Sequence, residues 1–369
     1  MQPRTILHPG IATLRPVSDR LQLALVGAGR IGAFHARHVA ELAACDGSCQ
    51  LAALVDPRPD LAPLAREMEA IQGSEVNAFA SLEACLDAGG IDAAVVASPT
   101  ALHREHALRL IAGGLRVLVE KPLTPSLEGD RAFAAELEAH HPHALMLAFQ
   151  RRFDAPLLHA KALVESGRIG RPFKYVSVLE DSRPLHKGYE SPGLLQDMSV
   201  HNVDEVLWLS GQTPVGIRAH GSRLYSQAIS SVEEDFDDVL LQIELADRSQ
   251  AQIQVSRNHV AGYRVETWIF GEEGVVHVGA FHRDPHQVVL EAHGRHATIE
   301  VRTFPLRAYE GGVPEFIDRF GDAYAAELKD FVDHCRSNTS FPVNHGDGLR
   351  AMEVIDAATA SMQRDDARR

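Results

Sequence analysis

Short apolar runs alternate with helical patterns through the first 150 residues of the chain. Such runs are typical of strands buried on both faces of a sheet, and their alternation with helices indicates a parallel sheet covered on both sides. The predicted strands cover residues 21–26, 51–55, 91–97, 115–119 and 144–149, and the clearest predicted helices cover 33–42, 102–113 and 127–139.

The pattern changes after Arg152. Strand-like segments separated by short turns dominate, and several of them alternate apolar and polar positions, which indicates an antiparallel sheet in a second, α+β domain. The predicted strands there cover residues 173–180, 215–224, 236–245, 249–257, 263–271, 274–280, 286–293 and 296–302, and long helical patterns cover 318–335 and 346–362.

The length of 369 residues fits two domains better than one. The first domain is expected to cover residues 20–150 and the second residues 151–345. The final segment, 346–369, is expected to be a helix that returns to the first domain. Residues 1–19 are interpreted as an irregular arm, with a tail of no fixed structure as an equal alternative.

Composition narrows the function classes. The net charge of −14 is spread along the chain, so there is no basic surface for nucleic acid, and an anionic membrane would repel the protein. No apolar stretch approaches a membrane span, and no signal peptide is recognised. Four cysteines are too few for a disulfide framework, which predicts reduced thiols in the cytoplasm.

No metal site is predicted. The histidine sets His103/His106 and His140/His141/His143 lack acidic or cysteine partners at ligand spacing. They are interpreted as helix-terminus or surface histidines.

A glycine-rich turn follows the first predicted strand. The run Gly27-Ala-Gly-Arg-Ile-Gly32 opens a helix, which is the context in which this spacing indicates dinucleotide binding. Gly27 would permit the tight turn, Gly29 would let the backbone approach a pyrophosphate, and Gly32 would let helix and strand pack closely. The helix N-terminus would offer N–H groups and a partial positive charge to the phosphates.

The residues after the second strand bear on the choice of cofactor. Asp56 is placed to accept hydrogen bonds from ribose hydroxyls, which favours NAD because a carboxylate repels a 2′-phosphate. Arg58 could pair with such a phosphate, so NADP stays an alternative.

Glu120-Lys121-Pro122 ends the fourth predicted strand. Ligands of open α/β sheets bind beyond the carboxyl ends of the strands, so Lys121 is expected at the ligand rather than on a solvated surface. Its charge could stabilise a developing alkoxide. Pro122 is expected to hold a rigid turn, with a cis peptide bond as one form of it.

A second candidate constellation is Asp197 and His201. Ser191 and Pro192 suit the start of a helix, and residues four apart share one face of it, so the carboxylate could orient the imidazole as a general base. The alternative is an exposed ion pair without a role in chemistry.

Taken in order, these motifs resemble the glucose–fructose oxidoreductase, inositol dehydrogenase and rhizopine catabolism family over roughly residues 20–365. Within that family the chain looks most like the inositol 2-dehydrogenases. The motifs that carry the resemblance are residues 26–32, 98–103, 117–122, 197–201, 319–324 and 347–349.

The resemblance implies roles for matching residues. Lys121 would lie between nicotinamide and substrate, His201 would be the general base, and Asp197 its orienting partner. Arg152 and Tyr263 would lie on the substrate side. The residues implied in cofactor binding are Gly27, Gly29, Arg30, Ile31, Gly32, Asp56, Arg58, Ser98, Pro99, Thr100, His103, Glu120 and Lys121.

The sequence therefore predicts an NAD(P)-dependent dehydrogenase of a cyclic polyol, with myo-inositol as leading substrate. A pyranose sugar or sugar derivative is the alternative within this class. A non-redox enzyme or a sensor with tightly bound NAD is the alternative outside it. The resemblance also implies a homodimer or homotetramer built through the open sheet of the second domain.

Overall fold

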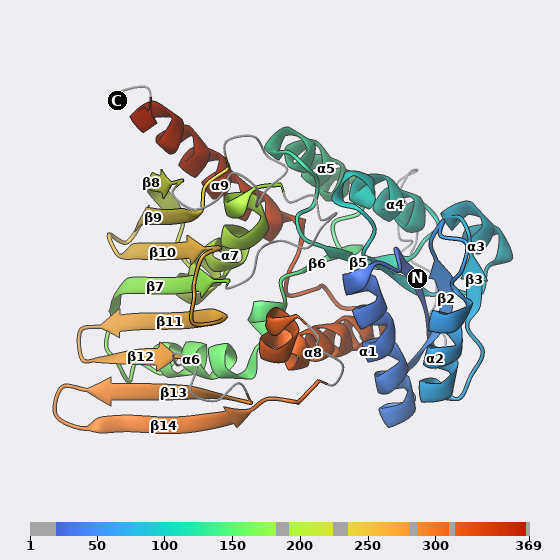
Figure 1. The fold of residues 1–369 in the computed structure, drawn as a ribbon, viewed down its shortest axis with the longest axis horizontal. Helices are drawn as coiled ribbons and strands as arrows, with labels where there is room; N and C mark the ends of the chain where they lie inside the picture. Colours follow the sequence, from blue (N-terminus) through green and yellow to red (C-terminus); the bar gives the residue numbers. More distant parts are fainter. Residues whose placement is uncertain (1–19, 182–191, 224–234, 280–285, 310–313, 367–369) are drawn as a thin grey trace, which may run out of the picture. The chain divides into compact units, whose positions relative to one another are not determined.

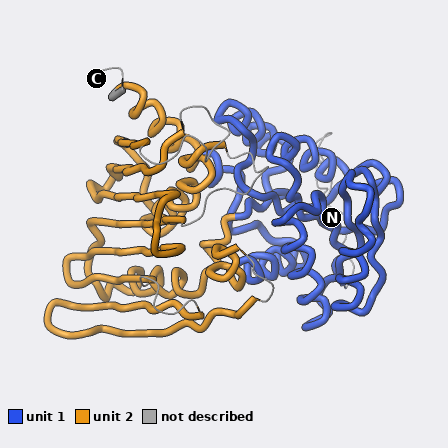
Figure 2. Tube along the Cα trace, viewed as in Figure 1, with its two compact units in different colours: residues 1–148, 324–349 blue, residues 149–323, 350–369 orange. Residues whose placement is uncertain are grey.

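The computed structural model describes residues 20–181, 192–223, 235–279, 286–309 and 314–366. The predicted arm at 1–19 and the predicted helix-capping Ser191 lie outside them. The chain divides into two compact units, which Figure 2 shows in blue and orange. Unit 1 comprises residues 1–148 and 324–349, and unit 2 comprises residues 149–323 and 350–369.

Unit 1 is built on a six-stranded sheet with the order β3-β2-β1-β4-β5-β6, in which all paired strands are parallel. This is the order of a dinucleotide-binding Rossmann fold, and it confirms the fold predicted for the first domain. The strands are β1 (Leu21–Val26), β2 (Cys49–Val55), β3 (Asn77–Phe79), β4 (Ala93–Val96), β5 (Arg116–Glu120) and β6 (Leu145–Ala148).

Helices cover both faces of this sheet. Figure 1 shows α1 and α2 on one side and α4 and α5 on the other. The first five helices are α1 (Arg30–Asp46), α2 (Ala62–Gln72), α3 (Leu82–Ala88), α4 (Thr100–Ala112) and α5 (Leu127–His140). Because both faces are covered, the residues of β4 and β5 are buried throughout, which explains the apolar runs Ala93–Val96 and Val117–Val119.

Unit 2 is built on an eight-stranded sheet with the order β14-β13-β12-β11-β7-β10-β9-β8. Only β7 and β10 pair in parallel, so the prediction of a mostly antiparallel sheet is confirmed. The strands are β7 (Pro172–Glu180), β8 (Pro214–Ser222), β9 (Asp238–Leu245), β10 (Gln250–Ser256), β11 (Arg264–Gly271), β12 (Gly274–Val278), β13 (Gln287–Gly294) and β14 (Thr298–Pro305).

One face of the unit 2 sheet packs against helices. Helix α6 contacts β12 and β13, and α7 contacts β7 and β10. On the opposite face several side chains are exposed, among them Leu240 and Val301. The helical elements of this unit before residue 300 are η1 (Gln150–Phe153), α6 (Ala155–Glu165), the π-helical turn η2 (Leu195–Ser199) and α7 (Val200–Ser210).

The two C-terminal helices, α8 (Glu315–Ser337) and α9 (His345–Asp366), are where the sequence predicted long helices. Their assignment to units differs from the expected domain boundaries, because Tyr324–Leu349 groups with unit 1 and Arg350 onward with unit 2. In unit 1, buried Arg116 of β5 donates to the carbonyl oxygens of His334 and Thr339 at the end of α8. In unit 2, the Ala219 N–H of β8 donates to Ser361 Oγ of α9.

A buried ion pair joins η1 to α7 in unit 2. Arg151 Nη1 donates to Glu205 Oε2 at 2.8 Å, and neither side chain is more than 2% exposed. The other oxygen of Glu205 accepts from Ser177 at 2.8 Å and from Thr267 at 2.6 Å. Since a buried charge without a partner is costly, these donors stabilise the carboxylate and fix α7 on β7 and β11.

Asp130 in α5 is a buried carboxyl whose pKa is raised by burial to about 6. The Thr124 hydroxyl lies 2.6 Å from Asp130 Oδ1 and 2.9 Å from the Ser126 carbonyl oxygen. That hydroxyl has a single proton, so both bonds form together only if Asp130 is protonated and donates to Thr124.

Asp130→Asn is expected to stabilise the protein above pH 6. The folded-state pKa of about 6 exceeds the ordinary aspartate pKa of 3.8, so the folded state loses stability as pH rises between these values, and the loss is complete above them. Asparagine resembles the protonated form and should recover up to about 3 kcal/mol of unfolding free energy. Urea denaturation at several pH values would measure this. An equal effect at pH 5 and pH 8, or destabilisation at pH 8, would contradict it.

Candidate functional site

The predicted cofactor residues of unit 1 lie beyond one edge of its sheet. Val26, the last residue of β1, is level with Val55 of β2 and Val96 of β4, and Val96 is level with Val119 of β5. The segments that follow these four strands therefore begin side by side. They contain eleven of the thirteen residues predicted to bind the cofactor. Of the other two, Glu120 is the last residue of β5 itself, and His103 lies one turn into α4.

The glycine turn has the geometry expected from its sequence. Gly27 has φ +92°, and a Cβ there would lie 2.5 Å from the backbone of Ser98. A Cβ on Gly32 would lie 1.8 Å from the Gly27 carbonyl oxygen. Both positions therefore need glycine for the fold of the unit itself.

Position 29 does not need glycine for the fold, but a side chain there would take up space in front of the helix N-terminus. Its φ of −61° suits any residue, and a Cβ there would meet no atom within 4 Å. It is the N-cap of α1, where no side chain caps the helix and no acidic residue occupies the first turn. The helix N-terminus therefore faces open space with donors and a partial positive charge, as a pyrophosphate requires. These residues fit NAD.

Gly29→Val is expected to keep the fold and to weaken NAD binding. Its side chain would occupy the space left for the phosphates, and overpacking of this kind costs about 1–3 kcal/mol, or roughly 10- to 100-fold in affinity. Cofactor titration and thermal unfolding would separate the two effects. An unchanged NAD dissociation constant would contradict the assignment of Gly29.

Asp56 has two roles at the end of β2. Its Oδ2 accepts from the Ala28 N–H at 2.7 Å, which holds the glycine turn, and its Oδ1 accepts from Arg58 Nε at 2.8 Å. Burial opposes ionisation, but the hydrogen bonds from Arg58 and Ala28 lower the pKa of this carboxyl. Asp56 is thus an anion at neutral pH, as discrimination against a 2′-phosphate requires.

Asp56→Asn should shift the preference of the enzyme toward NADP. The amide oxygen can still accept from Ala28, whereas the repulsion of a phosphate is lost and Arg58 can turn to it. We expect the ratio of kcat/KM for NADP to that for NAD to rise about 10- to 100-fold. The double variant with Arg58→Gln is the control and should lose most of this gain. A ratio unchanged by Asp56→Asn would contradict the role of its charge.

Glu120 and Lys121 lie at the end of β5. Glu120 is buried and accepts from His35 of α1 at 2.8 Å and from the Lys121 N–H at 3.2 Å. Burial opposes ionisation of Glu120, but the His35 hydrogen bond and nearby charges, Lys121 among them, lower its pKa. The Lys121–Pro122 peptide bond is cis, one of the forms expected for this turn. Glu120 thus orients the backbone that carries Lys121 and places a negative charge near its ammonium group.

His103 is not a surface histidine, contrary to the first interpretation. It is 1% exposed, with Nδ1 2.9 Å from the Pro122 carbonyl oxygen and Nε2 2.8 Å from that of Ser98. The helical pattern could not reveal this, because both partners lie outside the helix. His103 joins the segments that follow β4 and β5, so it supports the cofactor site by holding Ser98 and Pro122.

In unit 2, Asp197 and His201 lie where a π-helical turn meets an α-helix. Asp197 belongs to η2 and His201 to the first turn of α7. Residues four apart share a face in a continuous α-helix, but this spacing does not apply across a π turn, where hydrogen bonds run from i to i+5. The Leu194 N–H at the start of this segment donates to the Asp235 carboxylate at 2.9 Å, a cap that the sequence pattern did not indicate. π turns within helices are frequent at functional sites.

Arg257 is a candidate site residue that the sequence did not single out. It follows β10 directly, and its Nη2 lies 3.3 Å from Asp197 Oδ2, with the guanidinium side chain 3% exposed. The His201 ring meets buried Phe149 edge-on at 6.4 Å between ring centroids. The position of Arg257 at a strand end was the one available signal, but its partner is 60 positions away.

The two predicted substrate-side residues differ in surroundings. Arg152 is held by Asp204 of α7, with Nε 2.9 Å from Oδ2, so its contact with substrate stays a prediction. Tyr263 precedes β11, and burial raises the pKa of its hydroxyl, an effect that the nearby Arg151 and Arg319 partly oppose. The phenol therefore stays protonated at neutral pH and can donate a hydrogen bond.

Comparison with protein families identifies both units. A model described as the oxidoreductase family with an NAD-binding Rossmann fold matches residues 21–148, and one described as the GFO/IDH/MocA C-terminal domain matches residues 157–277. The chain belongs to the GFO/IDH/MocA family. The predicted resemblance is confirmed, and the protein is an NAD-dependent oxidoreductase.

Several relatives of known name match this member of the family along nearly its whole length. It is 28% identical to scyllo-inositol 2-dehydrogenase (NAD(+)) of Bacillus subtilis, over 94% of this chain and 95% of the relative. It is 29% identical to inositol 2-dehydrogenase of Streptomyces avermitilis, over 95% and 94%. The crystal structure of a myo-inositol dehydrogenase from Corynebacterium glutamicum superposes with a TM-score of 0.77 at 27% identity, covering 94% of this chain and 97% of that one.

Proposed function

We propose that the protein oxidises a secondary hydroxyl of an inositol, with myo-inositol as the leading substrate and NAD as the hydride acceptor. The observation that carries the proposal is the likeness to inositol dehydrogenases over about 94% of the chain. The candidate chemistry of each unit supports it, since one holds a cofactor site beside Lys121 and the other holds Asp197 and His201.

The mechanism assigns a role to each polar group. His201 removes the proton of the reacting hydroxyl, and Asp197 stabilises the imidazolium that forms. Lys121 stabilises the developing alkoxide. Tyr263 donates to a further hydroxyl and helps to orient the ring of the substrate. Bound NAD supplies the acceptor for the hydride of the carbinol carbon.

Charge balance in unit 2 favours a neutral polyol over a sugar acid. Each arginine that the structure describes around the candidate residues has a carboxylate partner, so little positive charge remains there for an anionic substrate. These pairs are Arg151–Glu205, Arg152–Asp204, Arg257–Asp197 and Arg319–Asp154.

Formation of NADH by the purified protein tests the proposal. The substrate panel contains myo-inositol, scyllo-inositol, aldoses and uronic acids, each with NAD and with NADP. We expect turnover with an inositol and NAD and little with the acids. Turnover of a pyranose alone would move the enzyme to the sugar branch. Turnover of uronic acids alone would contradict both the substrate and the charge argument.

The proposal also covers the cellular location of the protein and its oligomeric state. Among the described residues, no helix has the length and apolar character to cross a membrane, and the four cysteines are free thiols. We infer a cytoplasmic enzyme. The exposed face of the unit 2 sheet supports a homodimer or homotetramer formed through it, which light scattering of the purified protein would test.

A further inference from the structure

The loop that joins β10 to β11 carries a candidate site residue at each end. Arg257 at its start contacts Asp197, and Tyr263 at its end is the proposed substrate ligand. The loop tip has no apolar anchor, because Val260 is fully exposed and Ala261 is exposed as well. A segment with so little buried apolar surface depends on its polar contacts for a fixed conformation.

His259 supplies several of these contacts. Its backbone N–H donates to the Asp181 carbonyl oxygen at 3.1 Å, which attaches the loop to the end of β7. Its Nδ1 lies 2.6 Å from the Gly262 carbonyl oxygen, and since a carbonyl oxygen only accepts, Nδ1 carries the proton. The Gly262 N–H donates back to the His259 carbonyl oxygen at 3.3 Å. The imidazole therefore closes a tight turn just before Tyr263.

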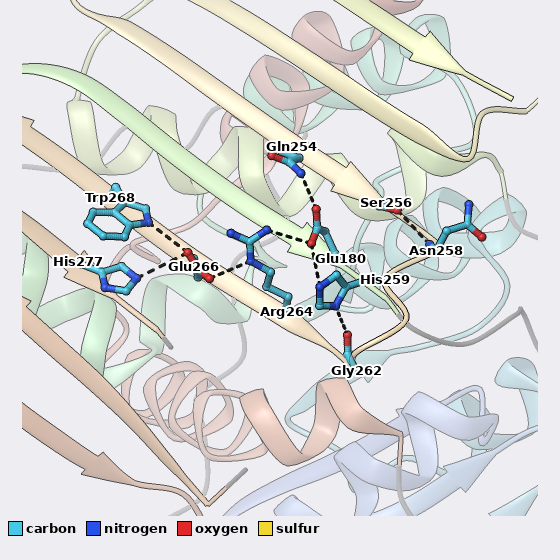
Figure 3. Close-up of polar contacts among 10 residues, drawn as sticks. All are labelled: Glu180, Gln254, Ser256, Asn258, His259, Gly262, Arg264, Glu266, Trp268 and His277. Carbon is cyan, nitrogen blue, oxygen red and sulfur yellow. Dashed lines mark hydrogen bonds and ion pairs between the residues drawn. The ribbon is translucent and has the colours of Figure 1, made fainter. Parts of the chain in front are cut away.

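Glu180 holds the other side of the ring. Its Oε2 lies 3.6 Å from His259 Nε2, and Figure 3 shows the imidazole between this carboxylate and Gly262. Glu180 is itself fixed, because Gln254 donates to it at 2.6 Å and Arg264 at 3.1 Å. Glu180, Gln254 and Arg264 belong to β7, β10 and β11. The contact with Glu180 therefore connects the imidazole to the sheet.

We propose that His259 is a positioning residue that fixes loop 257–263 and thereby places Tyr263 at the substrate and Arg257 beside Asp197. It touches neither substrate nor cofactor, and it acts through the turn that it closes. The inference rests on the proposed function, because it assumes that Tyr263 binds the polyol. It predicts that the loop governs substrate affinity while the NAD site of unit 1 is untouched.

Three variants separate this role from a general loss of stability. His259→Leu removes both ring contacts. His259→Asn keeps an amide donor close to the position of Nδ1 and so can still donate to Gly262. Val260→Ser changes the neighbouring, fully exposed side chain and is the matched control.

We expect His259→Leu to raise the KM for the polyol about tenfold, the worth of one hydrogen bond, with kcat and the NAD dissociation constant within about threefold of wild type. His259→Asn should restore most of the affinity, and Val260→Ser should behave as wild type. An unchanged KM in His259→Leu, or equal defects in the Leu and Asn variants, would overturn the proposal.

Amide hydrogen exchange of loop 257–263 tests the positioning role of His259 without any assumption about the substrate. Faster exchange in His259→Leu than in His259→Asn would support the fixing of the loop even if no inositol were oxidised, and then only the proposed function would have failed. Equal exchange in wild type and His259→Leu would overturn the positioning role whatever the substrate.

Discussion

Replacing Lys121 with methionine is expected to lower kcat by about 100- to 1,000-fold while NAD still binds. The loss follows from its proposed role, in which the ammonium group stabilises an alkoxide that develops during the reaction. A donor of this kind is worth about 3–4 kcal/mol. Lys121 stands at the end of β5, directly after the buried Glu120 that accepts its N–H. Steady-state kinetics and cofactor titration would measure the two effects separately.

The matched control for Lys121 is Lys329→Met on α8. Lys329 forms a half-exposed ion pair with Asp333 one helical turn away, and we give it no role in binding or chemistry. Its variant should retain wild-type kinetics. Turnover near wild type in Lys121→Met would remove this residue from the mechanism, and loss of NAD binding would instead indicate damage to the cofactor site.

The second large effect is expected for His201→Asn. Loss of a general base lowers kcat by about 100- to 10,000-fold, and the polyol KM should change far less because the fold of α7 is kept. Added imidazole should restore part of the activity by entering the space of the missing ring. The control is His220→Asn, a change of an exposed side chain on β8.

A fall of less than tenfold in His201→Asn would assign the base to another group. If His201→Asn binds the polyol normally but its activity stays low when imidazole is added, the general base would also be assigned to another group. The second outcome would direct attention to Asp197, whose Oδ2 lies 3.3 Å from Arg257 Nη2.

The nucleotide-binding half of the fold could be predicted because its signals are local. Continuous apolar strands, the glycine turn after β1 and the acid after β2 each depend on a few neighbouring residues. Strand β3 was missed because Asn77–Phe79 is three residues long and mostly exposed, so it lacks the apolar pattern. The strand order then placed Lys121 at the ligand edge without any further information.

The two C-terminal helices show what local sequence patterns can predict and what they cannot. Amphipathic patterns correctly predicted α8 and α9, but such a pattern indicates only that one face is buried, not which core buries it. Grouping with unit 1 or unit 2 depends on contacts such as those of Arg116 with His334 and Thr339. These partners are more than 200 positions apart, and no pattern along the chain connects them.

As with the fold, the sequence predicted those parts of the candidate site that depend on neighbouring residues, and not those that depend on distant ones. Lys121 and Asp56 follow strands, and both lie beyond the carboxyl ends of the same parallel sheet. The partners of Asp197 and Leu194 come from loops whose positions are set by the register of the unit 2 sheet, so Arg257 and Asp235 could not be inferred. The π turn that contains Asp197 and precedes His201 could not be predicted either, because its sequence fits an ordinary α-helix.

Transfer of deuterium tests the central claim most directly. The purified protein would be given NAD and myo-inositol deuterated on its carbinol carbons, and the cofactor and the product ketone would be analysed by mass spectrometry. We predict one deuterium in the reduced cofactor for each ketone formed. A cofactor that stays bound, carries no deuterium and yields no net NADH would contradict it and favour a non-redox enzyme or a sensor.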